Sequence, residues 1–255
     1  MKRAIVIGAS SGIGNEVARL LIADGWNLGV AARRTELLEE LRNECPERVT
    51  VASIDVTDVD APRKLLSLVN EIGGVGLFFY ASGIGKQNMP LDEEVEMQTV
   101  ETNVVGFTRM IDTMFNYMSE HQGGHIAVIS SIAGTKGLGA APSYSATKSF
   151  QAKYIEALQQ LANMRNLNIR FTDIQPGFVD TALLGDGHKY PLLMRKEDVA
   201  RQIYSAVSKQ KGRCILDWRY RLLTFFWRLI PRWVWVRLKI RPTSISSPRE
   251  EGLNT

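Results

Sequence analysis

Short apolar or β-branched runs alternate along most of the chain with longer stretches that have a helical period. The runs are continuously apolar, which is typical of strands buried on both faces of a parallel sheet. We predict seven strands, at 4–7, 27–31, 49–54, 75–80, 125–130, 168–174 and 213–216. Helices are predicted between them, at 12–24, 35–44, 58–72, 93–120, 143–164 and 196–209. This alternation predicts an α/β fold, a doubly wound and mostly parallel sheet with helices on both faces.

Composition changes this picture little, because 255 residues with 45% hydrophobic and 23% charged residues are ordinary for a globular protein. The distribution of the charge says more than its sum of +4. Residues 211–241 hold nine Lys or Arg against Asp217 alone and carry +8, whereas 1–210 carry −3 and 242–255 carry −1. The basic character therefore belongs to one C-terminal segment, and a nucleic-acid-binding surface over the whole molecule is not indicated.

The N-terminus and the cysteines are the features that bear on compartment and metals. Charged Lys2 and Arg3 precede a strand, a pattern unlike a secretory signal. Cys45 and Cys214 lie far apart and belong to no cluster of metal ligands. We therefore expect a cytoplasmic protein without a metal site.

The first predicted strand ends in a glycine-rich turn, and the next helix begins within it. Gly8, Gly12 and Gly14 have the spacing G-x-x-x-G-x-G. Glycine permits positive φ and a close approach of the backbone, and a helix N-terminus offers free N–H groups to a pyrophosphate. The turn is therefore predicted to bind a dinucleotide, with a purely structural tight turn as the alternative. The expected contacts are Gly8, Ser10, Ser11, Gly12, Ile13 and Gly14.

The residues after the second predicted strand indicate which dinucleotide is bound. An acidic side chain there would hydrogen-bond the 2′-hydroxyl of the adenosine ribose, whereas an arginine would accept a 2′-phosphate. The chain has Arg33 and Arg34, with no acidic residue before Glu36. We therefore predict NADP(H) in preference to NAD(H); the alternative is that both arginines are solvated charges at a helix start. Asp55 and Val56, after the third strand, are expected to flank the adenine.

A serine and a tyrosine–lysine pair follow the fifth predicted strand. Ser131 comes directly after the strand, and Tyr144 and Lys148 lie four residues apart on one face of the next helix. An ammonium group about 4 Å from a phenol, at an effective dielectric of about 20, contributes roughly 4 kcal/mol, or about three pKa units. We therefore expect Lys148 to lower the pKa of Tyr144 and make it a competent acid or base. By itself the pair is also compatible with an ordinary surface pair.

Taken together, these motifs resemble those of the short-chain dehydrogenase/reductase family, in its single-domain branch of about this length. The resemblance covers roughly residues 3–212 and implies a Rossmann-type fold with a seven-stranded sheet. The thirteen-residue spacing from Ser131 to Tyr144 matches the family pattern and separates Ser131 from its neighbour Ser130. The resemblance rests on Gly8, Gly12, Gly14, Asp55, Asn103, Ser131, Tyr144, Lys148 and the stretch 176–181.

The resemblance implies hydride transfer between a nicotinamide and a carbonyl or secondary alcohol. Tyr144 would protonate the developing alkoxide, and Ser131 would hold the same oxygen. Lys148 would bind the nicotinamide ribose, and Asn103 would anchor a water that connects Lys148 to solvent. Besides Tyr144 and Lys148, cofactor contacts are implied in the loops after the fourth and sixth strands, at Ala81, Ser82, Gly83, Pro176, Gly177, Val179 and Thr181.

The chain is expected to have three parts: a Rossmann-fold catalytic domain over 1–212, a basic aromatic-rich appendage over 213–241 and a flexible tail over 242–255. By analogy with the family, the helices at 93–120 and 143–164 would form a homodimer or homotetramer. The alternative to an enzyme is a regulatory or scaffold protein of the same fold that binds NADPH with little turnover. The complete tetrad argues against that alternative.

The stretch between Thr181 and Glu197 corresponds to the substrate lid of the family and is apolar, which favours an apolar or amphipathic substrate. Gly185 and Gly187 are its expected hinges. The apolar residues are Leu183, Leu184, Tyr190, Leu192, Leu193 and Met194. His121 and His125, beside a Gly-Gly turn, are expected at the surface.

Segment 218–240 contains four of the five tryptophans together with several arginines. At helical spacing Leu222, Phe226, Leu229 and Trp233 share one face, and the longest charge-free run is too short to span a bilayer. Three roles are open for these aromatic side chains. They would pack within the protein (on the core, over the cleft or against a second subunit), bind an anionic membrane surface from the cytoplasmic side, or bind nucleic acid. Aromatics and arginines on an amphipathic helix are typical of an interfacial anchor. A nucleic-acid partner is not expected.

Overall fold

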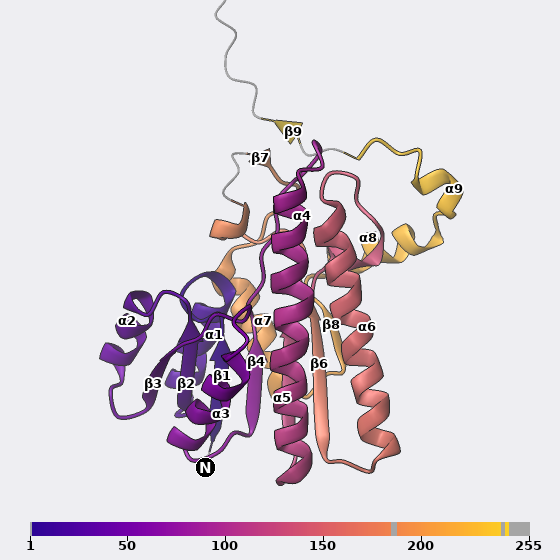
Figure 1. Ribbon diagram of the computed structural model, residues 1–255. Coiled ribbons are helices and arrows are strands. Elements are labelled where there is room, and N and C mark those ends of the chain that lie inside the picture. Colours follow the sequence, from indigo (N-terminus) through magenta and orange to yellow (C-terminus); the bar gives the residue numbers. More distant parts are fainter. Residues whose placement is uncertain (1, 185–187, 241–242, 245–255) are drawn as a thin grey trace, which may run out of the picture.

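The computed structural model describes residues 2–184, 188–240 and 243–244 (Figure 1). Seven strands, all parallel, form one sheet in the order β3-β2-β1-β4-β5-β6-β8. They are β1 (Arg3–Ile7), β2 (Asn27–Ala32), β3 (Val49–Ser53), β4 (Leu77–Tyr80), β5 (Gly124–Ile129), β6 (Ile169–Gln175) and β8 (Arg213–Ile215). A short antiparallel pair is formed by β7 (His188–Lys189) and β9 (Thr243–Ser244). The predicted doubly wound sheet is confirmed.

Helices cover both faces of the sheet (Figure 1). On one face lie α1 (Gly12–Ala23), α2 (Glu36–Glu44) and α7 (Lys196–Ser208), and on the other α3 (Ala61–Glu71), α5 (Phe107–Glu120) and α6 (Pro142–Met164). Ala4 and Val6 of β1 belong to the first core cluster, whereas Ile5 and Ile7 belong to the second. Because both faces of the sheet are buried from solvent, the strands are continuously apolar.

The strand order reverses at β1, where the chain first adds β2 and β3 on one side and later β4 on the other. The loops after β1 and β4 therefore separate at the carboxyl ends of the strands, where open α/β sheets bind their ligands. Gly8 lies in this crevice with φ +84°, and a Cβ on it would lie 2.8 Å from the backbone nitrogen of Ser82. Only glycine fits there.

The helix predicted over 93–120 is continuous but has a wider turn in its middle. α4 (Glu93–Val100) leads into a π-helical turn, Glu101–Gly106, from which α5 continues. A Cβ on Gly106 would lie 2.7 Å from the carbonyl oxygen of Val56, so glycine is needed for this approach. Single π-helical turns inside α-helices often mark functional sites, and this one contains Asn103.

The C-terminal segment packs on the domain. β8 pairs with β6, so the sheet extends past the boundary expected at residue 212. α8 (Trp218–Leu229) and α9 (Arg232–Trp235) follow and extend beyond α6 in Figure 1. The indole N–H of Trp235 donates to the Gly137 carbonyl at 2.8 Å, and the Lys136 ammonium donates to the Ile230 carbonyl at 2.9 Å. Of the tail expected over 242–255, the structure describes only β9.

His125 is buried, so the expectation of a surface position is wrong. It lies on β5, between β4 and β6, and its Nε2 is 2.8 Å from the hydroxyl oxygen of Thr172. Burial lowers the pKa of His125 to about 4, which keeps the ring neutral at physiological pH. The neighbouring Gly-Gly turn suggested exposure, but a central strand is covered on both faces.

Candidate active site

Ser131 and Tyr144 meet at the carboxyl end of β5. The Ser131 hydroxyl is hydrogen-bonded to the phenol of Tyr144 and accepts the backbone N–H of Ala133 at 3.1 Å. The bond between Ser131 and Ala133 caps a 3₁₀ turn, Ile132–Thr135, after which the chain continues toward α6. A Cβ on Gly134 would lie 2.7 Å from the backbone of Lys148, so a glycine lets this turn pack against the helix.

Tyr144 lies against the loop that follows β4. Its ring occupies the space that a side chain on Gly85 would need. Burial raises the pKa of Tyr144, and the hydrogen bond from Ser131 acts in the opposite direction. The Lys148 ammonium is 5.8 Å from the centre of the ring. The sequence predicted a lowered pKa for Tyr144; in the structure the pKa is raised, because desolvation of the phenol outweighs the hydrogen bond from Ser131.

Lys148 is a buried cation at the floor of the site, with 4% of its surface exposed. Burial lowers its pKa to about 8, and the carboxylate of Asp173 on β6 acts against that shift. Its ammonium donates to the Ile129 carbonyl at 3.1 Å and to the Gln151 side-chain oxygen at 2.9 Å. The ammonium of Lys148 is thus held by two neutral oxygens, and its pKa lies close to neutral pH.

Asn103 ties three elements together. Its side-chain nitrogen donates to the Ile84 carbonyl at 2.7 Å and to the Thr147 hydroxyl at 3.1 Å, and its side-chain oxygen accepts the Ile84 N–H at 2.9 Å. Its main-chain carbonyl accepts the side-chain amide of Gln151 at 2.9 Å. The side chain of Gln151 thus connects Asn103 to Lys148. The water that the resemblance implies, anchored by Asn103 and connecting Lys148 to solvent, stays a prediction. Gln151 was not predicted as a site residue.

Ser130 faces away from Tyr144. Its hydroxyl donates to the carboxylate of Asp173, whose other oxygen accepts the side-chain amide of Gln175 at 2.6 Å. Burial raises the pKa of Asp173. Ser130 therefore belongs to a polar network within the sheet, while its neighbour Ser131 faces the site.

The glycine-rich turn fits the phosphates of a dinucleotide. Gly12 has φ +59°, and a Cβ on Gly14 would collide with the Gly8 carbonyl. Ser11 precedes α1 without making a side-chain capping hydrogen bond, which leaves N–H groups of the first turn available to an anion. Thr181 lies across the crevice, with its methyl group 3.3 Å from the position of a Cβ on Gly12.

The other predicted cofactor residues border the same crevice. Arg33 and Arg34 follow β2, are exposed, and form no ion pair with any residue that the structure describes. The Asp55 carboxylate accepts the backbone N–H and the hydroxyl of Thr57, at 3.0 and 2.8 Å, and so shapes the turn after β3. Val56 is buried in the core. Ala81, Ser82 and Gly83 follow β4, and Pro176, Gly177 and Val179 follow β6.

Tyr220 is a second residue that the sequence did not single out. This fully buried side chain reaches from α8 to the substrate loop, where its hydroxyl accepts the Phe178 N–H at 3.1 Å and lies 3.0 Å from the Pro191 and Leu192 carbonyls. Its ring covers Gly177. Only the count of aromatic residues in segment 218–240 pointed to this region. The predicted hinges Gly185 and Gly187 lie outside the described residues.

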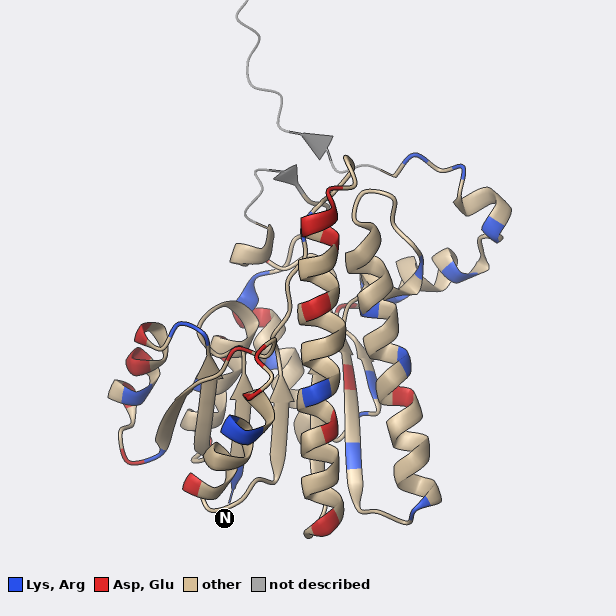
Figure 2. Cartoon of the chain, in the orientation of Figure 1, with Lys and Arg blue, Asp and Glu red and all other residues tan. Residues whose placement is uncertain are grey.

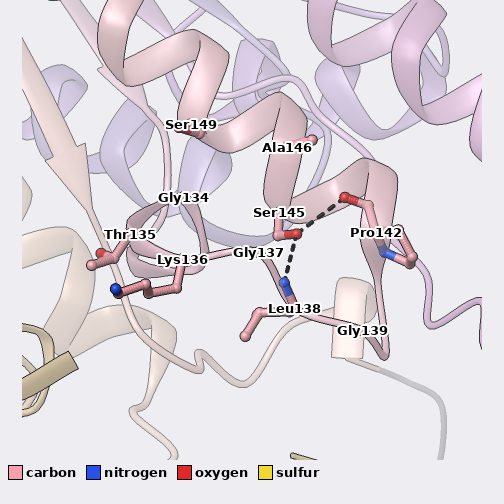
Figure 3. Close-up of a pocket in the computed structure, with 10 residues that line it drawn as sticks. All are labelled: Gly134, Thr135, Lys136, Gly137, Leu138, Gly139, Pro142, Ser145, Ala146 and Ser149. Carbon is pink, nitrogen blue, oxygen red and sulfur yellow. Dashed lines mark hydrogen bonds between the residues drawn. The ribbon is translucent and has the colours of Figure 1, made fainter. Parts of the chain in front are cut away.

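A pocket of about 510 Å³ lies between the start of α6 and the loop that precedes it (Figure 3). Pro142, Ser145, Ala146 and Ser149 line it from α6, whereas Tyr144 and Lys148 are on the other face of the helix. The Ser145 hydroxyl donates to the Pro142 carbonyl and accepts the Leu138 N–H, both at 3.0 Å. The pocket is therefore separate from the catalytic constellation.

Comparison with known proteins agrees with the geometry. Residues 2–189 match the family model of the short chain dehydrogenases. An uncharacterized oxidoreductase of Mycobacterium tuberculosis is 30% identical over 91% of this chain and 95% of its own. The dehydrogenase/reductase SDR family member 7B of Mus musculus is 29% identical over 83% of this chain and 72% of its own.

Solved structures share the fold. A short-chain dehydrogenase from Streptomyces avermitilis superposes with a TM-score of 0.78 at 25% identity, covering 89% of this chain and 92% of its own. An alcohol dehydrogenase from Thermococcus sibiricus, solved with 5-hydroxy-NADP, gives a TM-score of 0.74 at 24% identity over 85% of this chain and 96% of its own. With its parallel sheet, glycine-rich turn and Ser131–Tyr144–Lys148 cluster, the chain belongs to the short-chain dehydrogenase family and is an oxidoreductase.

Proposed function

We propose that the chain transfers a hydride between NADP(H) and a carbonyl or secondary alcohol of an apolar or amphipathic molecule. The observation that carries this proposal is the meeting of Ser131, Tyr144, Lys148 and Asn103 beside the glycine-rich turn. This crevice at the carboxyl ends of the strands is where open α/β sheets take their ligands.

The nicotinamide, when bound, supplies or takes up the hydride. In reduction, Tyr144 donates its phenolic proton to the developing alkoxide, and the Ser131 hydroxyl holds the substrate oxygen next to that phenol. Lys148, with a pKa of about 8, is mostly protonated at neutral pH and favours the phenolate that remains after proton donation. It also holds the ribose hydroxyls of the cofactor.

Arg33 and Arg34 support the preference for NADP(H). Both are exposed directly after β2, at the position where the adenosine ribose of a bound dinucleotide lies in doubly wound folds. Their charges are not engaged in ion pairs with described residues, so they are available to a 2′-phosphate. A guanidinium group matches phosphate oxygens in a bidentate way.

The substrate loop supports an apolar or amphipathic substrate. Leu183, Leu192 and Leu193 are exposed on it, and the ring of Tyr190 lies 4.7 Å from that of Phe178. The Tyr190 hydroxyl accepts the side-chain amide of Gln87 at 3.0 Å, two residues after the Gly85 on which the Tyr144 ring packs. Exposed leucines on this loop favour burial of an apolar substrate portion.

Turnover by Tyr144 is the direct test. With NADPH and a panel of aldehydes and ketones of increasing apolar size, wild type is expected to oxidise NADPH, followed by its absorbance. Tyr144→Phe removes the proton donor and is expected to lower kcat by about 10²- to 10⁴-fold while retaining NADPH binding. Tyr154→Phe, on the same helix and bonded to Asp112, serves as the matched control and is expected to keep wild-type turnover.

NADPH binding without any turnover that depends on Tyr144 would contradict the enzymatic proposal. That outcome would instead support a regulatory or scaffold protein that binds NADPH.

We propose, further, a homo-oligomer formed through α4, α5 and α6. Met97 on α4 and Phe150 and Leu161 on α6 are exposed apolar side chains. The ring of Phe150 stacks on Tyr154 with 5.4 Å between the ring centres, which holds it in a fixed orientation at the surface. Exposed apolar side chains on a rigid helical face favour contact with a second copy.

We also propose that segment 218–240 binds an anionic membrane surface. Trp218, Leu222, Phe225 and Leu229 recur at helical spacing along one side of α8, and each is at least half exposed. The opposite side of α8 carries the buried Tyr220 and Thr224. The apolar stripe formed by Trp218, Leu222, Phe225 and Leu229 continues in exposed residues beyond α8, namely Trp233, Val236, Leu238 and Ile240.

Charge favours an anionic partner for this stripe. Segment 218–240 has six basic residues and no acidic one. Arg221 and Arg228 flank the stripe on α8, and Arg232, Arg237 and Lys239 follow, all exposed. Figure 2 shows Lys and Arg in blue along this segment. Each basic residue near an anionic bilayer contributes roughly 1 kcal/mol. No helix in the described parts of the chain is long and apolar enough to cross a membrane, so the proposed contact is one that lies along the surface.

Co-sedimentation with vesicles tests this surface. Full-length protein is expected to pellet with vesicles that contain phosphatidylglycerol, less with phosphatidylcholine alone, and less at high salt. The triple variant Leu222→Gln, Phe225→Gln, Leu229→Gln is expected to lose most binding. Truncation after Leu216 is a poorer test, because it also removes the buried Tyr220 and Trp235.

Val59→Gln, an exposed apolar position before α3, is the matched control and is expected to pellet like wild type. Wild type that stays in the supernatant with anionic vesicles would overturn the membrane proposal, and so would a triple variant that still pellets fully. In the first case, binding to a nucleic acid in a parallel assay would assign the arginines to that partner instead.

A further inference from the structure

The side chain of Gln151 joins the lysine of the site to the π-helical turn. We propose that Gln151 is a positioning residue that fixes the Lys148 ammonium against the main chain of Asn103. This inference rests on the proposed hydride-transfer function and adds a member to its machinery.

The geometry gives Gln151 one orientation. It is completely buried on α6, three residues after Lys148. Its side-chain oxygen accepts the ammonium at 2.9 Å, and its side-chain nitrogen donates to the Asn103 carbonyl at 2.9 Å. An ammonium has only donors and a carbonyl has only acceptors, so a flipped amide would lose both of these hydrogen bonds. Gln151 therefore acts as a fixed link rather than as a space filler.

The link also fixes the orientation of the Lys148 ammonium, so that one N–H group points toward the site. An ammonium has three N–H groups. Ile129 accepts one at 3.1 Å and Gln151 accepts another. The third remains for the cofactor ribose. Without Gln151 the flexible lysine side chain would have a single acceptor and more than one rotamer.

Asn103 is a firm anchor for this link. Its side chain is held by Ile84 on the loop after β4 and by Thr147 on α6, and it is completely buried. The loop after β4, the π-helical turn and α6 are thereby joined through Asn103 and Gln151 to one ammonium group. A displacement of any of the three elements would move Lys148.

The charged form of Lys148 depends on its neighbours. The titratable groups that face it are Asp173 on β6, whose carboxylate favours the ammonium, and Tyr144 on the same helix. The Gln151 oxygen favours the ammonium further, because a hydrogen bond to the charged form opposes the effect of burial. Reduction needs both the ammonium of Lys148 and the protonated phenol of Tyr144.

Two substitutions with opposite effects test the proposal. Gln151→Leu keeps the approximate size but removes the acceptor, so Lys148 is expected to lose its proton at a pH lower by at least about one unit. Gln151→Glu places a carboxylate beside the ammonium, so Lys148 is expected to keep its proton to a higher pH. The alkaline limb of kcat/KM for carbonyl reduction is expected to move in the same two directions.

The Lys148 titration is measured without turnover by NMR of protein labelled with ¹³C at lysine Cε, assigned by comparison with Lys148→Met. Gln160→Leu, an exposed glutamine on the same helix, is the control and is expected to titrate like wild type. Thermal unfolding checks that each variant is folded. If Gln151→Leu does not fold, the nearly isosteric Gln151→Glu still has to show the upward shift.

Folded variants whose Lys148 titrates as in wild type would overturn the proposal. So would shifts of both variants in one direction, which is what a merely structural role for Gln151 would give. A wild type with the expected Lys148 titration but no carbonyl turnover would contradict the proposed function and leave the positioning role intact, so the two failures are distinguishable.

Discussion

At the scale of single residues, the proposed preference for NADP(H) depends on Arg33 and Arg34. Arg33→Ala and Arg34→Ala are each expected to weaken NADPH binding by about tenfold or more, because each removes a hydrogen-bonding cation from a phosphate, and to leave NADH binding nearly unchanged. Fluorescence titration with both dinucleotides measures the two dissociation constants. Arg42→Ala, on α2 and paired with Glu39, is the control. Equal losses for NADPH and NADH would refute the assignment.

Some of the other site residues were predicted from the sequence and some were not. Tyr144 and Lys148 are recognised by their four-residue spacing, and Ser131 by its distance from Tyr144. Gln151 has no such signature, because its role depends on a main-chain carbonyl 48 positions earlier in the chain. Likewise, the pKa of Tyr144 followed from the depth of burial, which spacing does not give.

At the scale of elements, Tyr220 couples α8 to the substrate loop. Tyr220→Phe keeps the ring over Gly177 but leaves the Phe178 N–H without its acceptor. An unsatisfied partly buried N–H costs about 1–3 kcal/mol. We expect a lower free energy of unfolding and a higher KM for the carbonyl substrate, because the loop loses its attachment to α8.

Denaturant unfolding and steady-state kinetics measure these two effects. Tyr117→Phe, whose ring stacks on His121 away from the site, is the control and is expected to change neither. A Tyr220→Phe enzyme with wild-type KM and wild-type stability would refute the coupling of α8 to the loop.

The π-helical turn between α4 and α5 was not predicted from the sequence. The polar and apolar pattern over 93–120 describes one helix, and the backbone indeed runs as one helix. A single widened turn does not disturb that pattern, yet it is where Asn103 bonds to Ile84, Thr147 and Gln151. Those partners come from the loop after β4 and from α6, so only packing reveals them.

At the scale of the whole molecule, the surfaces proposed for assembly and for membrane contact are different. The apolar side chains proposed for assembly lie on α4 and α6, and those proposed for the membrane lie on α8 and in the residues that follow it. Phe150→Glu is expected to convert the oligomer to a monomer, because a buried unpaired carboxylate opposes the interface. Sedimentation equilibrium gives the mass. Val59→Glu, at an exposed site before α3, is the control. A monomeric wild type would refute the proposed interface.

The sequence by itself determined the order of strands and helices along the chain and the doubly wound parallel sheet, and it predicted the glycine, serine, tyrosine and lysine positions of the site. These follow from local period and spacing, which adjacent residues encode. The tertiary structure alone decided which side chains turn inward. It buried His125 on a central strand, and it turned Tyr220 toward the core but Leu222, Phe225 and Leu229 toward solvent. It also brought Gln151 between Lys148 and Asn103. Contacts between distant segments depend on the packing of whole elements, and no local pattern records them.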